Sequence, residues 1–349
     1  MSVSSAQILE KEYGFQLDKM KILNGGLKAW KRAGYVVLRG DEDPSDASSD
    51  RYRSVELSYR AVVRDIPEKT SKVSIWIPIP RTNAVQKLIE IQLSSDLPYT
   101  LLADKDYNNR FAYVELSGDQ IRDNKVSLTA FFRVHRQSYK KRELAEDIRL
   151  GMNNPPERFL GPSSLVPIDG KIAKEANAVV RGFEKPFLWA ELLFNHIVAT
   201  LEYDKSETGW GSGDALRARD IRAGDCTDFH SLFIGEARSL GIPARLIMGF
   251  PLPSEDKEGT IPGYHCWAEF YIDDHGWIPV DASEARRNWD KKDSYFGNID
   301  AHRIGFTIGR DIHIPRAQDR SVQNYIIYPY AEVDGKEMLV DWKMSFKDS

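Results

Sequence analysis

Cysteine is scarce in this sequence, and its scarcity excludes two classes of protein. Only Cys226 and Cys266 occur among the 349 residues. Disulfide-stapled small scaffolds and four-cysteine zinc modules both require more cysteines than this. The two thiols can therefore form at most one disulfide, unless one or both of them serve a chemical role.

Long hydrophobic runs and a strong excess of charge are also lacking. Apolar runs such as residues 192–194 and 246–248 are far shorter than the ~18–20 residues that span a bilayer. Residues 1–13 do not show the basic, apolar and small-residue order of a signal peptide. The balance of 48 Lys and Arg against 52 Asp and Glu argues against a nucleic-acid binder. We therefore expect a cytoplasmic protein with no membrane span and no nucleic-acid partner, or a periplasmic one if the true N-terminus lies further upstream.

The chain is long enough for roughly two or three domains, since 42% of its residues are hydrophobic and 29% are charged. Shifts in composition and periodicity divide it into segments. These are a strand–helix fragment at 1–40, an acidic linker at 41–50, a β-sandwich domain at 51–137, a connector with a helix at 138–185, a core at 186–315 and a C-terminal β-hairpin at 316–349.

The first two segments carry short motifs but no complete site. In residues 22–37, a double glycine forms a turn before a short helix, which a further glycine ends. This string resembles about the last third of a rhodanese (sulfurtransferase) domain. The cysteine of that family would lie before it, and no cysteine precedes Cys226, so sulfur transfer is not predicted. The segment 41–50 lacks the turn glycine and the closing glutamate of a calcium loop, and we interpret it as a linker.

Residues 51–137 alternate between apolar and polar side chains, which is the period-two pattern of β-strands. Within residues 72–79 this alternation predicts a strand with one buried face, formed by Val73, Ile75, Ile77 and Ile79. Further strands are predicted at 52–63, 88–93, 110–116 and 126–134. Short strands separated by turn residues are typical of an antiparallel sandwich. In the C-terminal segment, Asp334 and Gly335 predict a hairpin turn.

Helical patterns follow at 171–181 and 186–201. Pro186 suits the first turn of the second helix, because its missing amide would be unpaired there. His196 lies on the apolar face of that helix, where we expect a hydrogen-bonded core histidine rather than a ligand. The two histidines beyond residue 300 show no metal-like spacing, so neither a metal nor a cofactor is predicted.

Cys226 stands at the start of a predicted helix. The sequence Gly224-Asp225-Cys226 precedes an amphipathic pattern over 227–240, which Gly241 ends. Unpaired amides and the positive end of the helix dipole stabilise a thiolate at such a position, which lowers the pKa of a nucleophilic cysteine. A free cysteine is often only a small buried hydrophobe, so position alone does not settle its role.

A predicted β-hairpin supplies partners for Cys226. After a predicted loop at 251–263, residues 264–272 are expected to form one strand, 273–276 a turn and 277–281 the returning strand. His265 is the expected base and Asp281 its orienting carboxylate, in a Cys–His–Asp triad. Alternate strand residues face opposite sides. If His265 faces the helix start, Cys266 therefore lies behind the strand, and a disulfide is not expected.

The register of the hairpin decides whether this triad can form. A four-residue turn would pair Asp281 with Ala268, on the strand face opposite His265. The triad therefore requires a loop of three or five residues, or a bulge. His230, on the same helical face as Cys226, is a competing base. We rank it below His265, because a base on a separate strand can approach the sulfur from the substrate side.

These segments resemble the transglutaminase-like superfamily, whose fold is a relative of papain. The resemblance covers roughly residues 186–315 and rests on three blocks. The blocks are Gly224-Asp225-Cys226 with the following stretch 238–245, then His265-Cys266-Trp267-Ala268-Glu269, then Gly276-Trp277-Ile278-Pro279-Val280-Asp281. The resemblance implies an α+β fold with a papain-like core preceded by an antiparallel β-sandwich. It also implies Cys226, His265 and Asp281 as nucleophile, acid/base and orienter. Cys266 departs from the family pattern, where a small residue such as alanine is more usual, and we expect this to affect packing more than chemistry.

The resemblance further implies chemistry on amide bonds through a thioester. We expect a cysteine peptidase or amidohydrolase acting on a peptide or protein. A protein-glutamine acyltransferase (transglutaminase) and a non-catalytic protein- or glycan-binding module are the alternatives. Trp210 and Tyr264 are candidates for lining the cleft or contacting the oxyanion, with packed aromatics as the alternative interpretation. The backbone amide of Cys226 is the expected oxyanion donor. No oligomeric state is predicted.

Overall fold

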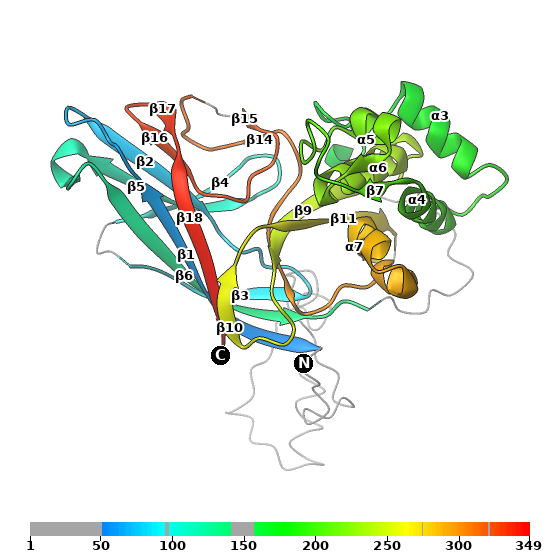
Figure 1. Ribbon diagram of the computed structural model, residues 1–349, viewed down its shortest axis with the longest axis horizontal. Helices are drawn as coiled ribbons and strands as arrows, with labels where there is room; N and C mark the ends of the chain where they lie inside the picture. Colours follow the sequence, from blue (N-terminus) through cyan, green and yellow to red (C-terminus); the bar gives the residue numbers. More distant parts are fainter. Residues whose placement is uncertain (1–50, 95–97, 141–156, 274, 320–321) are drawn as a thin grey trace, which may run out of the picture.

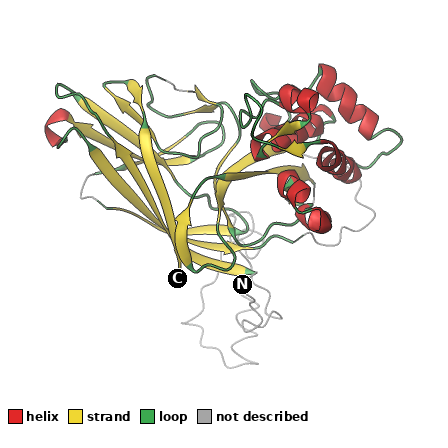
Figure 2. Ribbon diagram, in the orientation of Figure 1, coloured by secondary structure: helices red, strands yellow, loops and turns green. Residues whose placement is uncertain are grey.

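The computed structural model describes residues 51–94, 98–140, 157–273, 275–319 and 322–349. The predicted rhodanese-like fragment at 1–40, the linker at 41–50 and part of the predicted connector lie outside the described residues. Figure 1 shows a strand-rich part beside a helix-rich part, and Figure 2 separates the two by colour. Within the described residues, no helix is long and apolar enough to cross a membrane.

Two five-stranded antiparallel sheets make up the strand-rich part. The first has the order β10-β18-β1-β6-β3, with β10 Glu258–Ile261, β18 Val340–Asp348, β1 Tyr52–Val63, β6 Val126–Gln137 and β3 Gln86–Leu93. The second has the order β17-β16-β2-β5-β4, with β17 Lys336–Met338, β16 Tyr330–Val333, β2 Lys72–Pro78, β5 Arg110–Ser117 and β4 Thr100–Ala103. The inward side chains of both sheets belong to one continuous hydrophobic cluster.

The predicted strands between residues 51 and 137 are present, but β2 differs from its prediction. The alternating pattern predicts one buried face, whereas all but the first residue of β2 are buried. The second face is covered because Trp76 packs against the rings of Tyr113 and Tyr330. Its indole N–H also donates to the carbonyl of Pro315, at 2.8 Å. A segment distant in the sequence therefore buries the face that the local pattern leaves open.

Strands from three distant parts of the chain meet in these sheets. The hairpin turn predicted at Asp334 and Gly335 is confirmed, because both have positive φ and Val333 pairs with Lys336. The segment 251–263, predicted as a loop, instead contains β10, which pairs with β18. The loop prediction was wrong for those residues because their pairing partner lies at the C-terminal end of the chain. Strands of the predicted segments 51–137, 186–315 and 316–349 thus share sheets.

The helix-rich part contains an antiparallel sheet of order β12-β11-β9-β13. Its strands are β9 Ala244–Pro251, β11 His265–Ile272, β12 Gly276–Val280 and β13 Arg303–Ile308, and its α-helices are α3 Gly170–Val179, α4 Pro186–Thr200, α5 Ala215–Ile221, α6 Cys226–Ser239 and α7 Ala282–Arg287. Shorter elements are β7 Glu202–Tyr203, β8 Ala223–Gly224, β14 Ile312–His313 and β15 Val322–Gln323, with 3₁₀ turns at Gly118–Gln120, Glu157–Phe159 and Trp289–Tyr295. Pro186 occupies the first turn of α4, as predicted.

Helix α6 lies at the centre of this part. It contacts β11 and β9 on one side and α3, α4, α5 and α7 on the others. The helix predicted over 227–240 is confirmed as α6, but its predicted amphipathic character was wrong, since every residue of α6 except the last is buried. Its polar side chains are enclosed, and they must find partners inside the protein.

One of these enclosed side chains is a carboxyl group in the core. Within the described residues, neither oxygen of the fully buried Glu236 has a hydrogen-bond partner. Its neighbours are Glu175 and His196, whose polar atoms lie within 4.8 Å of those of Glu236. Glu175 is already engaged by His196 at 2.9 Å, Arg219 at 2.6 Å and Arg222 at 2.7 Å. His196 is thus hydrogen-bonded as predicted, although it is only half-buried.

We predict that Glu236→Gln stabilises the protein increasingly as the pH rises. Burial, with the charge of Glu175, raises the pKa of Glu236 well above its ordinary value. The unfolded chain releases the carboxyl proton of Glu236 near the ordinary pKa of glutamate, while the folded protein retains it. The contribution of this residue to wild-type stability therefore falls as the pH rises above that ordinary pKa. Glutamine has no such proton. The melting temperature of the variant relative to wild type should increase by on the order of 2 °C or more between about pH 5 and pH 8. An equal difference at both pH values would contradict the prediction.

Candidate active site

Cys226 is the first residue of α6, and the residues around it fix the helix start. The Asp225 carboxylate accepts the amide N–H groups of Thr227 and Asp228, at 2.8 and 3.4 Å. The Asp228 carboxylate accepts the Asp225 amide in return, at 3.0 Å, which completes a capping box. A Cβ at Gly224 would lie 2.4 Å from that of Asp228, so only glycine fits there. The cap does not use the amide of Cys226, and the thiol lies at the positive end of the helix dipole.

The hairpin formed by β11 and β12 has the register that the predicted Cys–His–Asp triad requires. Ile272 pairs with Gly276, which leaves a loop of three residues, and Val280 pairs with Ala268. The next residue, Asp281, therefore comes opposite Trp267, on the same strand face as His265. Nε2 of His265 lies 2.7 Å from Oδ2 of Asp281. The required three-residue loop is present, and it brings the imidazole and the carboxylate together.

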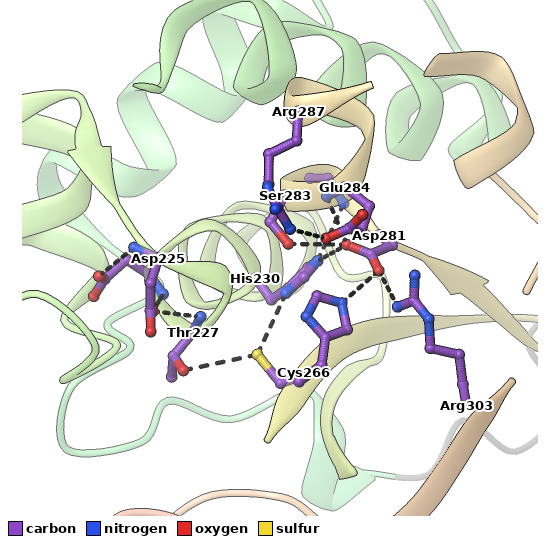
Figure 3. Close-up of polar contacts among 12 residues, drawn as sticks. Asp225, Thr227, His230, Cys266, Asp281, Ser283, Glu284, Arg287 and Arg303 are labelled. Atoms are coloured by element: carbon purple, nitrogen blue, oxygen red, sulfur yellow. Dashed lines mark hydrogen bonds and ion pairs between the residues drawn. The ribbon is translucent and has the colours of Figure 1, made fainter. Parts of the chain in front are cut away.

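Asp281 is held by several groups besides His265 (Figure 3). The guanidinium of Arg303, at the start of β13, donates to the same carboxylate oxygen. The other oxygen accepts the hydroxyl of Ser283 at 2.9 Å and the amide of Glu284 at 3.0 Å, so Asp281 also caps α7. Burial raises the pKa of Asp281, but the charges of His265 and Arg303 bring it well below its ordinary value. The carboxylate is therefore ionised and fixed in orientation.

The surroundings shift the pKa values of Cys226 and His265 in opposite directions. Nε2 of His265 faces Asp281, which leaves Nδ1 for its hydrogen bond with Cys226. Burial lowers the pKa of His265, yet the charge of Asp281 raises it overall to about 9. For Cys226, the hydrogen bond from Cys266 lowers the pKa, burial opposes this, and the hydrogen bond and charge of His265 lower it further, to well below its ordinary value. The two groups thus favour a thiolate–imidazolium pair at neutral pH.

Cys266 does not lie behind the strand, where it is predicted to lie. Its sulfur lies 3.7 Å from the hydroxyl of Thr227 and 3.6 Å from Nδ1 of His230, both on α6 (Figure 3). The prediction that Cys266 faces away from the helix start was wrong. The strand face that carries Cys266, Ala268 and Phe270 packs against α6, whereas His265 stands at the very start of β11. At the end of a strand, side chains of both faces can reach the same helix terminus.

His230, the competing base, has both ring nitrogens engaged. Its Nε2 accepts the amide N–H of Ala282 at 3.1 Å, so the ring N–H is on Nδ1, which lies 3.6 Å from the sulfur of Cys266. The ring is fully buried beneath the site. This geometry supports the ranking of His265 above His230 as the partner of Cys226.

The two aromatic candidates differ in placement. The hydroxyl of Tyr264 lies 3.0 Å from Oγ1 of Thr227 and 3.3 Å from Oδ2 of Asp225, directly at the start of α6. The side chain of Trp210 is 43% exposed, and its ring centroid lies 5.1 Å from the Lys205 ammonium. Tyr264 is therefore part of the candidate site, whereas Trp210 stands at the surface of a neighbouring loop.

Sequence reasoning did not identify the residues that attach the Trp210 loop to α6. The Asp228 carboxylate accepts the amides of Gly211 and Gly213, at 2.8 and 2.9 Å. The buried Arg310 donates to Ser231 on α6 at 2.6 Å and to the carbonyl of Gly213 at 3.0 Å. Neither that arginine nor Arg303 carries a local signal, because their partners lie far away in the chain.

Part of the chain matches the model of a protein family, and a known protein is similar over most of its length. Residues 174–282, which include Cys226, His265 and Asp281, match the model of the Transglutaminase-like superfamily. The chain is 26% identical over 307 residues to an uncharacterised protein of Haemophilus influenzae, covering 76% of this chain and 81% of that protein.

Solved structures are similar as well. A crystal structure named "Putative Cysteine Protease" from Cytophaga hutchinsonii has a TM-score of 0.54 and 16% identity, covering 85% of this chain and 92% of that one. The periplasmic domain of TgpA from Pseudomonas aeruginosa, bound to ethylmercury, has a TM-score of 0.34 and 18% identity, covering 65% of this chain and 90% of that one. The first likeness establishes a common fold, a mixed α/β architecture with antiparallel sheets.

Proposed function

We propose that this protein is a thiol-dependent enzyme that hydrolyses amide bonds through an acyl-enzyme thioester. The observation that carries the proposal is the connected series Cys226, His265 and Asp281 at the start of α6. The hydrogen bond between His265 and Asp281, at 2.7 Å, fixes the ring so that its other nitrogen serves the sulfur. A thiolate beside an oriented imidazolium is the arrangement that thiol acyl transfer requires.

Each residue has a defined part in the proposed cycle. The Cys226 thiolate attacks the amide carbonyl carbon, and the Cys226 backbone amide, at the helix start, donates to the oxyanion. His265 then gives its proton to the departing amine as the C–N bond breaks, which leaves a thioester on Cys226. A water molecule attacks the thioester while His265 accepts its proton, and the carboxylic acid leaves. Asp281 stays ionised throughout and holds the ring.

The raised pKa of His265 favours an amide as the substrate. An amine is a poor leaving group unless a proton reaches its nitrogen as the bond breaks. With a pKa of about 9, His265 carries that proton throughout the neutral range. Hydrolysis is proposed over acyl transfer because water is always available as the acceptor. The tyrosine hydroxyl of Tyr264, at the same helix start, is proposed to line the acyl site.

The test is a digestion of a diverse peptide mixture in ¹⁸O-labelled water. Wild type should generate new C-termini that carry ¹⁸O, and Cys226→Ala should generate none above background. Equal cleavage by Cys226→Ala would overturn the proposal. A parallel digestion with hydroxylamine separates the two acceptors, since peptide hydroxamates formed in place of ¹⁸O-carboxylates would favour acyl transfer.

A further inference from the structure

The two cysteines of the chain are brought together by the packing of β11 on α6. They are 40 residues apart in the sequence, and there are no others. The thiol of Cys266 donates to the hydroxyl of Thr227, the residue after Cys226, at 3.7 Å, and hydrogen bonding between the two cysteines is the first cause that lowers the pKa of Cys226. Both cysteines are reduced and buried. Each side chain therefore has the other as its only possible intramolecular disulfide partner, and both lie at the start of α6.

The surroundings give the two thiols unequal character. Hydrogen bonding and the charge of His265 hold the pKa of Cys226 well below its ordinary value. Burial, followed by the hydrogen bond to Cys226 and its charge, raises the pKa of Cys266 well above its ordinary value. Cys226 is thus the reactive thiolate and Cys266 the protonated neighbour. Oxidants attack the thiolate form, so oxidation begins at Cys226.

We infer that Cys266 is a resolving thiol, which converts Cys226 oxidised by a hydroperoxide into a reversible Cys226–Cys266 disulfide. This inference rests on the proposed function only in taking Cys226 as the reactive thiolate. The disulfide occupies the sulfur that attacks the substrate, so it turns the site off. It also protects that sulfur, because a sulfenic acid left unresolved is oxidised onward to sulfinic acid, which ordinary thiols do not reduce.

The chemistry balances in two steps. The Cys226 thiolate attacks one oxygen of the hydroperoxide, the O–O bond breaks, and the departing oxygen takes a proton, which His265 can supply. The Cys266 thiol then attacks the sulfenic sulfur: an S–S bond forms, the S–O bond breaks, and water leaves with the thiol proton. The peroxide gains two electrons, and the two thiols lose them. Two equivalents of a small thiol reverse the reaction by exchange.

The contacts of Cys266 suit the second step. Loss of the negative charge on Cys226, when it becomes sulfenic acid, removes one of the causes that keep Cys266 protonated. The Nδ1–H of His230, 3.6 Å from the Cys266 sulfur, then supports the developing thiolate. Both cysteines stand at the beginnings of their elements, the first residue of α6 and the second of β11. Small backbone adjustments there disrupt few of the hydrogen bonds within either element.

The test compares wild type with Cys266→Ser after exposure to hydrogen peroxide. Wild type should lose both free thiols, lose the mass of two hydrogen atoms, yield one cross-linked peptide containing Cys226 and Cys266, and recover both thiols with dithiothreitol. Cys266→Ser should instead gain oxygen at Cys226 and recover several-fold less thiol. Three results would overturn the inference. These are oxygen gained by wild type, a disulfide between two chains, and a recovery of free thiols in wild type that is no better than in Cys266→Ser.

A second variant keeps the test decisive should Cys266→Ser fold poorly. In Cys226→Ser, Cys266 should remain a free thiol under the same peroxide treatment, and its oxidation would contradict the assignment of Cys226 as the first target. None of these readouts requires a substrate. If the disulfide forms but no amide is hydrolysed, only the proposed function is refuted. If amides are hydrolysed but no disulfide forms, only this inference is refuted.

Discussion

His265→Ala is expected to lower the kcat/KM for amide hydrolysis by about 10⁴- to 10⁶-fold, since residues that act as a catalytic unit lose most of its activity when one is removed. The variant loses one of the groups that stabilise the Cys226 thiolate, and it loses the proton donor for the leaving amine. Thermal unfolding should show that the variant is folded. Steady-state kinetics on a peptide found in the ¹⁸O digestion measure the effect.

Two other histidines provide the controls for this result. His313 is exposed and pairs with Asp106 at the surface, so His313→Ala should retain wild-type activity. His230→Gln keeps an acceptor for the Ala282 amide and should cost far less than His265→Ala, because His230 is engaged with Cys266 and Ala282. A His230→Gln variant as inactive as His265→Ala would transfer the role of base to His230.

Asp281→Asn is expected to lower kcat by about 10³- to 10⁴-fold, the size of effect seen when an orienting carboxylate of a triad becomes an amide. Asparagine is as good a helix cap as aspartate, so α7 should keep its start. The loss therefore reports on His265: the amide can hold the ring in the wrong tautomer, and it removes the charge that raises the pKa of the imidazole.

The pH profile separates this explanation from a loss of structure. In wild type the protonated form of His265 is the acid, so kcat/KM should fall as the pH rises through about 9, the pKa of His265. In Asp281→Asn the same fall should begin at lower pH, because the charge of Asp281 no longer raises that pKa. Asp300→Asn is the matched control, since Asp300 is half-exposed and lies 3.8 Å from Arg303 rather than against the ring. If kcat/KM of Asp281→Asn falls at the same alkaline pH as that of wild type, Asp281 does not raise the pKa of His265.

Local rules in the sequence predict much of the candidate site. Capping residues and a following apolar pattern mark the start of α6 at Cys226. Strand parity then restricts the hairpin loop to a few lengths, and the structure has one of them, with three residues between Ile272 and Gly276. These features depend on neighbours within a few residues along the chain. They can therefore be predicted from a single sequence.

Features that depend on distant partners could not be predicted in this way. Alternation shows that His265 and Cys266 leave β11 on opposite faces, but not which face packs on α6. The full burial of α6 depends on α3, α4 and α5, and the pairing of β10 with β18 joins segments about eighty residues apart. Arg303 reaches Asp281 from a separate strand, and arginines that serve such carboxylates have no motif of their own.

The thiolate character of Cys226 is tested by the pH dependence of the rate at which iodoacetamide alkylates Cys226, followed by peptide mapping from about pH 5 to pH 9. The shape of the plot of alkylation rate against pH reports the protonation of the sulfur, even if burial slows the reaction at every pH. A thiolate held by His265 predicts an alkylation rate that is nearly constant between about pH 6 and pH 8 and that falls when His265 is replaced. A rate that rises about tenfold per pH unit up to ~8.5, as for an ordinary thiol, or a label that appears on Cys266 instead, would contradict it.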